Sequence, residues 1–224
     1  MCQCVYVGVW VWVCACVRMH IFFCSYYCSY SFTAAEVDAG AHMLQRTAEA
    51  ILEAYAETDP DLQEALDRGE SPVIDVSVSY DGTWQKRGFT SLFGVGISIN
   101  VLTGLVIDYE VLSKYCHACK MTEAKDLPAR QLAAWKEQHA PDCCQNHQLS
   151  SKAMEQDVAK ILWGRSVTKV GFWYVEMLSD GDSAAYKAVC SLDPYHPQKT
   201  DKLEYINHAH KRMGTALRKL AKEQ

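Results

Sequence analysis

Three consecutive segments in the middle of the chain alternate apolar and polar side chains, which is the pattern of half-buried β-strands. They cover residues 73–80, 92–101 and 105–112, and only the turn sequence Leu-Thr-Gly separates the last two. Consecutive strands joined by short turns pair as antiparallel neighbours. We therefore expect an antiparallel three-stranded meander, to which the rest of the fold must be joined.

The segments on either side of the meander predict helices and one further strand. Apolar residues recur every three or four positions in several stretches, and Asp59 with Pro60 interrupts the first of them. The expected elements are helices at 34–68, 127–139, 150–166 and 183–192, a buried strand at 170–178, and a basic helix at 203–222. This order is typical of an α/β fold with a ribonuclease H-like core, in which crossover helices continue the sheet beyond the meander.

The first 33 residues differ in composition from the rest of the chain. They hold six of its eleven cysteines, and they have neither the basic start nor the small-residue cleavage site of a signal peptide. Their apolar run, which Arg18 and His20 interrupt, is shorter than the roughly 20 residues that span a bilayer. We expect residues 1–33 to be a low-complexity leader outside the fold of residues 34–224, and we expect no membrane partner.

The formal net charge is −5 at pH 7, so binding to nucleic acid cannot be inferred from the overall charge. Such binding has to rest on local basic surfaces. Residues 199–224 carry seven Lys or Arg and three Asp or Glu, a formal balance of +4. A helix of this kind can neutralise the phosphates of bound DNA, although such charge more often belongs to a solvated face.

Carboxylates stand at the ends of two predicted strands. Asp81 follows the first strand, and Asp180 and Asp182 follow the strand at 170–178. If these strands are neighbours, Asp81 and Asp180 lie side by side, where two carboxylates repel each other unless a cation separates them. Mg²⁺ or Mn²⁺ suits such a site, and two such ions can support phosphodiester cleavage. In the alternative interpretation, both Asp-Gly pairs only form turns or cap a helix.

A second group of cysteines has the spacing of a metal site. Two residues separate Cys116 from Cys119 and three separate His139 from Cys143, with one short helix expected between the pairs. Thiolates and imidazoles at these spacings can close a tetrahedral Zn²⁺ site of the structural type, which orders the intervening loop. The alternative is a set of free thiols. The other donors near enough to substitute for a ligand are His117, Cys144 and His147.

Three long phrases of the sequence closely resemble the Mutator-like transposase domain. They are DGTWQKRGFTSLFGVGISINVLTGLVIDYEVLSKYCHAC from Asp81, SDGDSAAY from Ser179 and NHAHKRMGTALRKL from Asn207. The resemblance covers roughly Glu36 to the C-terminus. It implies a ribonuclease H-like fold and an enzyme that cuts DNA at transposon ends and joins those ends to target DNA, with a catalytic triad of two aspartates and one glutamate.

The same resemblance implies roles for particular residues and partners. Asp81 is then the first catalytic aspartate and Asp180 the second, and the resemblance supports a metal-ligand set of Cys116, Cys119, His139 and Cys143. The implied cofactors are Mg²⁺ or Mn²⁺ for catalysis and Zn²⁺ for structure. The implied partner is DNA, in the nucleus, with no small-molecule substrate, and a homo-oligomer is compatible with this interpretation.

The chain departs from the family pattern at the third acidic residue. Glu204 is the available candidate, but Tyr205 follows it where the family often has cysteine. The family's glutamate is expected on a later helix, beyond Gln224, so we expect the chain to be truncated at its C-terminus. Two functions follow: a DNA transposase domain, inactive if the third acid is lost, or a zinc-stabilised DNA-binding remnant without catalysis.

Overall fold

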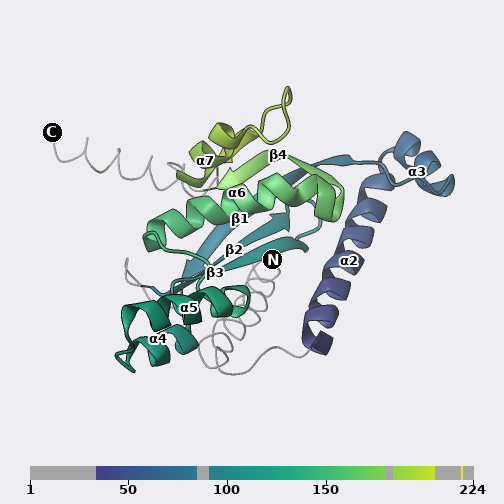
Figure 1. The fold of residues 1–224 in the computed structure, drawn as a ribbon. Helices are drawn as coiled ribbons and strands as arrows, with labels where there is room; N and C mark the ends of the chain where they lie inside the picture. The colour runs from purple at the N-terminus through teal and green to yellow at the C-terminus, as the bar shows by residue number, and fades with distance from the viewer. Residues whose placement is uncertain (1–33, 85–90, 180–183, 205–217, 219–224) are drawn as a thin grey trace. The chain divides into compact units, whose positions relative to one another are not determined.

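The computed structural model describes residues 34–84, 91–179, 184–204 and 218 of the chain. The helices in these ranges are α2 (Ala34–Ala56), α3 (Pro60–Asp67), α4 (His117–Glu123), α5 (Ala129–His139), the short 3₁₀ helix η1 (Ala140–Asp142), α6 (Ser151–Val170) and α7 (Ala184–Leu192). The strands are β1 (Ile74–Trp84), β2 (Phe93–Asn100), β3 (Val106–Ser113), β4 (Phe172–Ser179) and β5 (Asp201–Glu204), and Figure 1 labels most of these elements. The expected leader at 1–33 lies outside the described residues.

The five strands form one mixed sheet in the order β3-β2-β1-β4-β5. β1 pairs with β4 in parallel, and β4 pairs with β5 in parallel. The prediction that the first strand and the strand after α6 are neighbours is therefore confirmed. The mixed α/β class that we expected is confirmed as well.

The β2–β3 hairpin follows directly from its turn residues. The amide of Asn100 donates to the carbonyl of Leu105 at 2.8 Å, and the Asn100 side chain accepts from the amide of Thr103 at 2.9 Å. Gly104 has a φ of 71°, in the left-handed region that favours glycine. The break between the first two helices is also local, because the Asp59 carboxylate caps the start of α3 and Pro60 takes its first position.

The chain divides into two compact units. Of the described residues, the first contains 34–43, 82–84, 91–96 and 110–158, and the second contains 44–81, 97–109, 159–179, 184–204 and 218. Each unit has its own buried apolar residues. These include Phe93, Val95, Leu112, Met154 and Val158 in the first unit, and Ile51, Val76, Val78, Ile107, Leu162, Phe172 and Met177 in the second.

The second unit is centred on the indole of Trp163 from α6. Its ring packs edge-on against Tyr80 of β1 and Tyr174 of β4, with ring centroids 5.9 Å and 5.1 Å away. The Trp163 Nε1–H also donates to the carbonyl of Tyr174 at 3.2 Å, so burying the indole leaves its polar group paired. This cluster fixes the later part of α6 to two neighbouring strands.

The first strand does not end where the Asp-Gly pair predicts. We expected Asp81 at the strand end with a turn at Gly82, but β1 continues to Trp84. Two close approaches explain the glycines here. A Cβ at Gly94 would lie 2.0 Å from the Trp84 ring, and a Cβ at Gly82 would lie 3.3 Å from Cγ of Glu155. The indole therefore packs on bare backbone and keeps the strand extended.

β4 changes its register against β1 near its middle. Val76 pairs with Tyr174, whereas the next residue, Ser77, pairs with Glu176. Val175 is thus an extra residue in β4, a β-bulge of the kind that is rare between parallel strands. The Ser77 hydroxyl donates to the Glu176 carboxylate just after the bulge.

The outward edge of β3 is occupied by groups from outside the sheet. The Thr47 hydroxyl donates to the carbonyl of Val106 at 3.0 Å. Near the other end of the strand, the Asn146 amide side chain donates to the carbonyl of Val111 at 3.0 Å. The amides of Asn146 and His147 both donate to the carbonyl of Ser113 at 3.0 Å. These bonds cover an edge strand that would otherwise offer unpaired acceptors.

Two elements were predicted wrongly or missed. Residues 203 and 204 were expected to begin a basic helix, but they belong to β5, and nearly all of the remaining expected helix lies outside the described residues. The short helix α4 was not expected in the Cys- and His-rich region. Among the described residues, none of the helices combines the length and the apolar character needed to cross a membrane.

Candidate metal centre

The structure brings together the four residues with metal-site spacing. The ligand atoms of Cys116, Cys119, His139 and Cys143 all lie within 4.8 Å of one another. The Cys116 Sγ is 3.2 Å from the His139 Nε2, and the Cys119 Sγ is 3.6 Å from the Cys143 Sγ. Within the ranges that the structure describes, this is the group of His, Cys, Asp and Glu side chains that could hold a metal ion.

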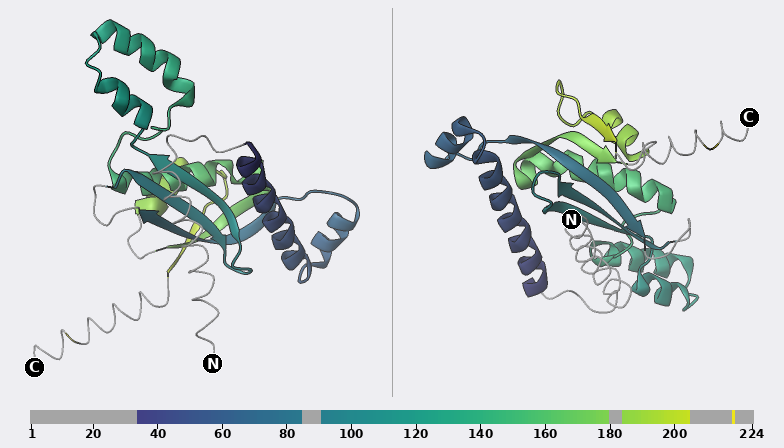
Figure 2. Two further views of the ribbon diagram at one scale, coloured as in Figure 1. Left: turned by 90° about the horizontal axis from the view of Figure 1, so that it is seen from below. Right: turned by 180° about the vertical axis from the view of Figure 1, so that it is seen from behind.

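Each ligand stands at a defined point of a helical hairpin made by α4, α5 and η1, which lie together in the first unit (Figure 2). Cys116 is the N-cap residue of α4 in an extended conformation, and Cys119 lies one turn further along the same helix. His139 is the last residue of α5, and Cys143 follows η1 directly. The start of α4 therefore supplies two ligands, and the end of α5 together with the residue after η1 supplies the other two.

The imidazole of His139 is held in place by its own helix. The Trp135 ring stacks on it at a centroid distance of 4.6 Å with an interplanar angle of 20°. Trp135 lies four residues earlier in α5, so the two rings share a helix face. The stacked indole limits the rotation of the imidazole and keeps Nε2 turned toward Cys116.

The two buried thiols have different proton affinities. Burial raises the pKa of Cys116, but the backbone amide of Cys119, the His139 side chain and the amide of Cys144 lower it to about 6. Burial, together with the contacts to Cys143 and Cys116, raises the pKa of Cys119 to about 12. A bound divalent cation removes this difference in pKa, because it stabilises the deprotonated form of several thiols at one point.

The donor set and its dimensions fit zinc. Three sulfurs and one imidazole nitrogen form a Cys₃His set, which is typical of structural zinc sites. A regular tetrahedron with Zn–S bonds of about 2.3 Å has edges of about 3.8 Å. The Cys116–His139 and Cys119–Cys143 separations of 3.2 Å and 3.6 Å lie close to that edge, and all four ligand atoms lie within 4.8 Å of one another, so the groups are close enough to converge on one ion.

The substitute donors suggested by the sequence have other positions. The Nδ1 atom of His117 is hydrogen-bonded to the Tyr115 hydroxyl at 3.1 Å, and Cys144 is exposed. His147 is buried, and its Nδ1 lies 3.6 Å from the Asp157 carboxylate. The structure therefore brings together the four predicted ligands and leaves these three residues outside the cluster.

The hairpin has little apolar core of its own. None of the residues of α5 is buried, and α4 buries only Cys119 and Thr122. Glu123 forms ion pairs with Lys120 at 3.0 Å and Lys136 at 3.1 Å, but such exposed pairs contribute little. Because helices this short are marginal without tertiary packing, the ligand cluster is the feature best able to hold them together.

The structure describes two of the three expected acidic site residues. Asp81 is exposed and lies within β1. Glu204 is exposed and ends β5. Asp180, together with the alternative Asp182, lies outside the described residues.

The strand pairings relate these three positions. Ser79 pairs with Leu178, and Asp81 and Asp180 each follow that pair by two residues. Glu204 pairs with Ser179, the residue before Asp180. Their roles in catalysis remain predictions.

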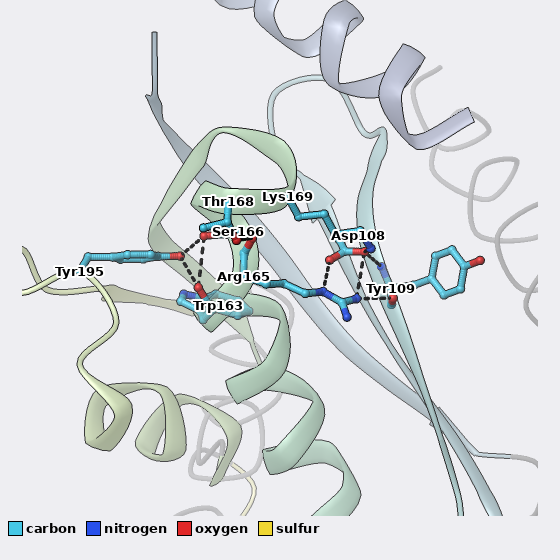
Figure 3. Close-up of polar contacts among 8 residues, drawn as sticks. All are labelled: Asp108, Tyr109, Trp163, Arg165, Ser166, Thr168, Lys169 and Tyr195. Carbon is cyan, nitrogen blue, oxygen red and sulfur yellow. Dashed lines mark hydrogen bonds and ion pairs between the residues drawn. The ribbon is translucent and has the colours of Figure 1, made fainter. Parts of the chain in front are cut away.

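A buried ion cluster in the second unit was not expected from the sequence. Asp108 of β3 is fully buried, and its carboxylate accepts from Arg165 at 2.8 Å and 3.1 Å and from Lys169 at 2.7 Å (Figure 3). Arg165 also donates to the carbonyl of Tyr109 at 2.9 Å. The available signals were an aspartate inside an apolar strand and two basic residues four apart on a helix.

The comparison with known families identifies the chain. Residues 29–224 match the Mutator-like transposase family, so the chain belongs to that family. The match begins slightly before Glu36, where the resemblance was first seen. No curated protein and no solved structure matches the chain significantly.

Proposed function

We propose that this chain is a DNA transposase domain that cleaves and joins phosphodiester bonds with the help of Mg²⁺ or Mn²⁺. Asp81 and Asp180 are the proposed metal ligands, and Glu204 is the proposed third acid. The ions would polarise the phosphate and stabilise the attacking and leaving oxygens. Because the proposed substrate is DNA, we expect the protein to act in the nucleus.

The observation that carries this proposal is the parallel register of the sheet in a chain of this family. The pair Ser79–Leu178 precedes Asp81 and Asp180 by the same two residues, and Glu204 is level with the residue before Asp180. The strands β1, β4 and β5 are parallel neighbours, and by this count each has one carboxylate at the same end. Such a group suits divalent ions, which are bound by carboxylates together with substrate phosphates. The order β3-β2-β1-β4-β5, with helices between the later strands, also supports a ribonuclease H-like core.

The Cys₃His cluster has a separate role in this proposal. Four protein ligands leave no open position for substrate, so Zn²⁺ there would order the α4–α5 hairpin and take no part in cleavage. The hairpin would then be a rigid surface for contacts with DNA. Its exposed basic side chains include Lys120, Lys125, Arg130 and Lys136.

The test is Mn²⁺-dependent nicking of supercoiled plasmid DNA by the full chain. Asp81→Asn removes a metal ligand and should lower the rate at least about a hundredfold. Asp75→Asn is the matched control, because Asp75 is another exposed aspartate of β1. Equal rates for the wild-type chain and Asp81→Asn would refute the proposal.

A second candidate is a zinc-stabilised DNA-binding module without catalysis, and the Cys₃His hairpin favours it. Such a module should bind DNA with an affinity that falls steeply with salt concentration, because bound phosphates release their counterions. Binding that survives Asp81→Asn but is lost with Cys119→Ser would support this candidate. Binding that does not respond to salt would exclude it.

A further inference from the structure

The metal cluster contains one pair of thiols that are close enough to react with each other. The Cys119 Sγ and the Cys143 Sγ lie 3.6 Å apart, although the two residues are 24 positions apart in the sequence. Bonded sulfurs in a disulfide are about 2.05 Å apart, so a movement of about 1.5 Å closes the bond. Cys119 belongs to α4 and Cys143 follows η1 directly, so such a bond would join the beginning of the hairpin to its end.

The two thiols of this pair differ in their access to solvent. Cys119 is buried, whereas Cys143 is half-buried. A dissolved oxidant therefore reaches the Cys143 sulfur more easily. Cys116 is buried as well, and its sulfur contacts the His139 imidazole at 3.2 Å. Cys143 is thus the accessible member of the close pair, and Cys119 is the buried thiol in contact with it.

The exposed Cys144 is a poor disulfide partner for Cys143, although it is the next residue. The peptide bond between them is trans, and the α-carbons on either side of a trans bond lie about 3.8 Å apart. Disulfides usually join α-carbons that are about 4.4–6.8 Å apart, so a bond between these neighbours would be strained. Cys144 also lies outside the cluster of four ligand atoms. The geometry therefore favours Cys119 over Cys144.

We propose that the Cys₃His cluster is a redox-sensitive site, at which hydrogen peroxide joins Cys119 to Cys143 and the zinc ion is released. The sulfur-to-sulfur distance and the unequal burial of the two thiols carry this inference. It rests on zinc binding by the cluster and is independent of the proposed cleavage of DNA.

The reaction has two steps and consumes one molecule of peroxide. The Cys143 thiolate attacks a peroxide oxygen, the O–O bond breaks and hydroxide leaves, so the sulfur becomes a sulfenic acid. The Cys119 thiolate then attacks that sulfur, and a second hydroxide leaves as the disulfide forms. The two sulfurs together give up two electrons, which reduce the peroxide. The two hydroxides take up two protons and become water.

Oxidation removes two of the four zinc ligands. Only Cys116 and His139 remain, and a structural zinc site needs four protein ligands, so the ion dissociates. The disulfide still joins α4 to the residue after η1. None of the residues of α5 is buried, so no packing within that helix replaces the contact of His139 with the ion. Oxidation should therefore loosen α5 while the beginning and end of the hairpin stay linked.

The experiment treats the zinc-loaded full chain with hydrogen peroxide. A coloured chelator records zinc release, and mass spectrometry of unreduced tryptic peptides maps the disulfides. Trypsin places Cys116 and Cys119 on residues 115–120, Cys143 and Cys144 on residues 137–152, and the other cysteines of the chain on other peptides. Fragment spectra then identify the linked cysteines. Zinc should be lost as the Cys119–Cys143 disulfide appears, and dithiothreitol with added Zn²⁺ should restore the cluster.

Two variants test the role of Cys143. Cys143→His can bind zinc in a Cys₂His₂ set, which also occurs in structural sites, but it cannot form the disulfide. It should release zinc in peroxide at least about tenfold more slowly than the wild-type chain. Cys144→Ser is the matched control, because it removes the neighbouring exposed thiol and leaves the four ligands in place. It should lose zinc at the wild-type rate and form the same disulfide.

Hydrogen–deuterium exchange gives a readout of order in the hairpin. Exchange of the α5 amides should speed up as zinc is lost. The inference is overturned if the wild-type chain keeps its zinc in peroxide, or if the disulfide that accompanies release joins Cys116 to Cys119 or two chains through Cys144. Equal release rates for Cys143→His and the wild-type chain would overturn it as well. If Cys143→His binds no zinc, the disulfide map of the wild-type chain decides. None of these results depends on whether the chain nicks DNA.

Discussion

The helical hairpin of the first unit and the Trp163 cluster of the second are both ordered, but for opposite reasons. In the hairpin, α5 buries none of its residues, and the convergent groups are three thiols and an imidazole. Around Trp163, large rings are fully buried, and the indole N–H is paired with the backbone carbonyl of Tyr174. We propose that the hairpin depends on a metal ion bound by its side chains, whereas the Trp163 cluster depends on the burial of its rings away from water.

The largest expected effect is a loss of order in the hairpin, while the Trp163 cluster stays ordered. Cys119→Ser removes a ligand, and apparent binding energies of structural Zn²⁺ are about 10–16 kcal/mol, far more than the hairpin's own packing supplies. The variant should lose bound zinc and the exchange protection of α5, while the protection of β4 stays unchanged. Zinc analysis combined with hydrogen–deuterium exchange measures both.

Cys190→Ser is the control for that experiment, because Cys190 is an exposed free thiol on α7. It should keep the zinc content and the exchange pattern of the wild-type chain. Retained protection of α5 in zinc-free Cys119→Ser would show that the hairpin is ordered by packing after all.

A smaller effect is expected from the buried ion cluster of the second unit. Asp108→Ala leaves Arg165 and Lys169 without their shared carboxylate. Both cations are partly exposed, so the loss in the free energy of unfolding should be about 2 kcal/mol, below the usual value for a fully buried pair. Chemical denaturation followed by tryptophan fluorescence measures it.

A triple variant that replaces all three charged side chains gives a second comparison with Asp108→Ala. Asp108→Leu combined with Arg165→Met and Lys169→Met should be more stable than Asp108→Ala, because no buried charge is left without a partner. Zinc content should be the same in all these chains. A triple variant less stable than Asp108→Ala would mean that the charges themselves stabilise the unit.

The smallest expected effect is a pH dependence confined to the hairpin. Zn²⁺ binds thiolates, and burial raises the pKa of Cys119 in the metal-free chain to about 12, so binding near neutral pH must release its proton. Lower pH opposes that release. The affinity for Zn²⁺ should fall at least about tenfold for each unit that the pH is lowered from roughly 8.5 to 6.5.

Competition with a coloured chelator at several pH values measures this slope. The unfolding of the second unit, followed by hydrogen–deuterium exchange of the β4 amides, should not show the same dependence. An affinity for Zn²⁺ that stays constant over this range would indicate that Cys119 does not bind the metal as a thiolate.

The sequence predicted those features that depend on local pattern. The hairpin turn followed from Gly104, the start of α3 from Asp59 and Pro60, and the grouping of Cys116 with His139 from ligand spacing. The adjacency of β1 and β4 in the sheet was also predicted, because the order of elements along the chain restricts how the sheet can continue.

The features that were missed depend on contacts between distant segments. The turn expected at Gly82 gives way to a strand because Trp84 packs on Gly94, which an Asp-Gly pair does not reveal. The bulge at Val175 is hidden inside an unbroken apolar run, and the helix α4 buries too few residues to show a periodic pattern. These features are decided by tertiary packing, which overrides local preference.

The occupied edge of β3 bears on how this protein behaves at high concentration. Exposed edge strands recruit strands of other molecules and begin aggregation. A foreign strand approaching β3 would have to displace Thr47 from Val106 or Asn146 from Val111 before it could pair. Polymerisation through that side of the sheet therefore carries a cost in lost hydrogen bonds.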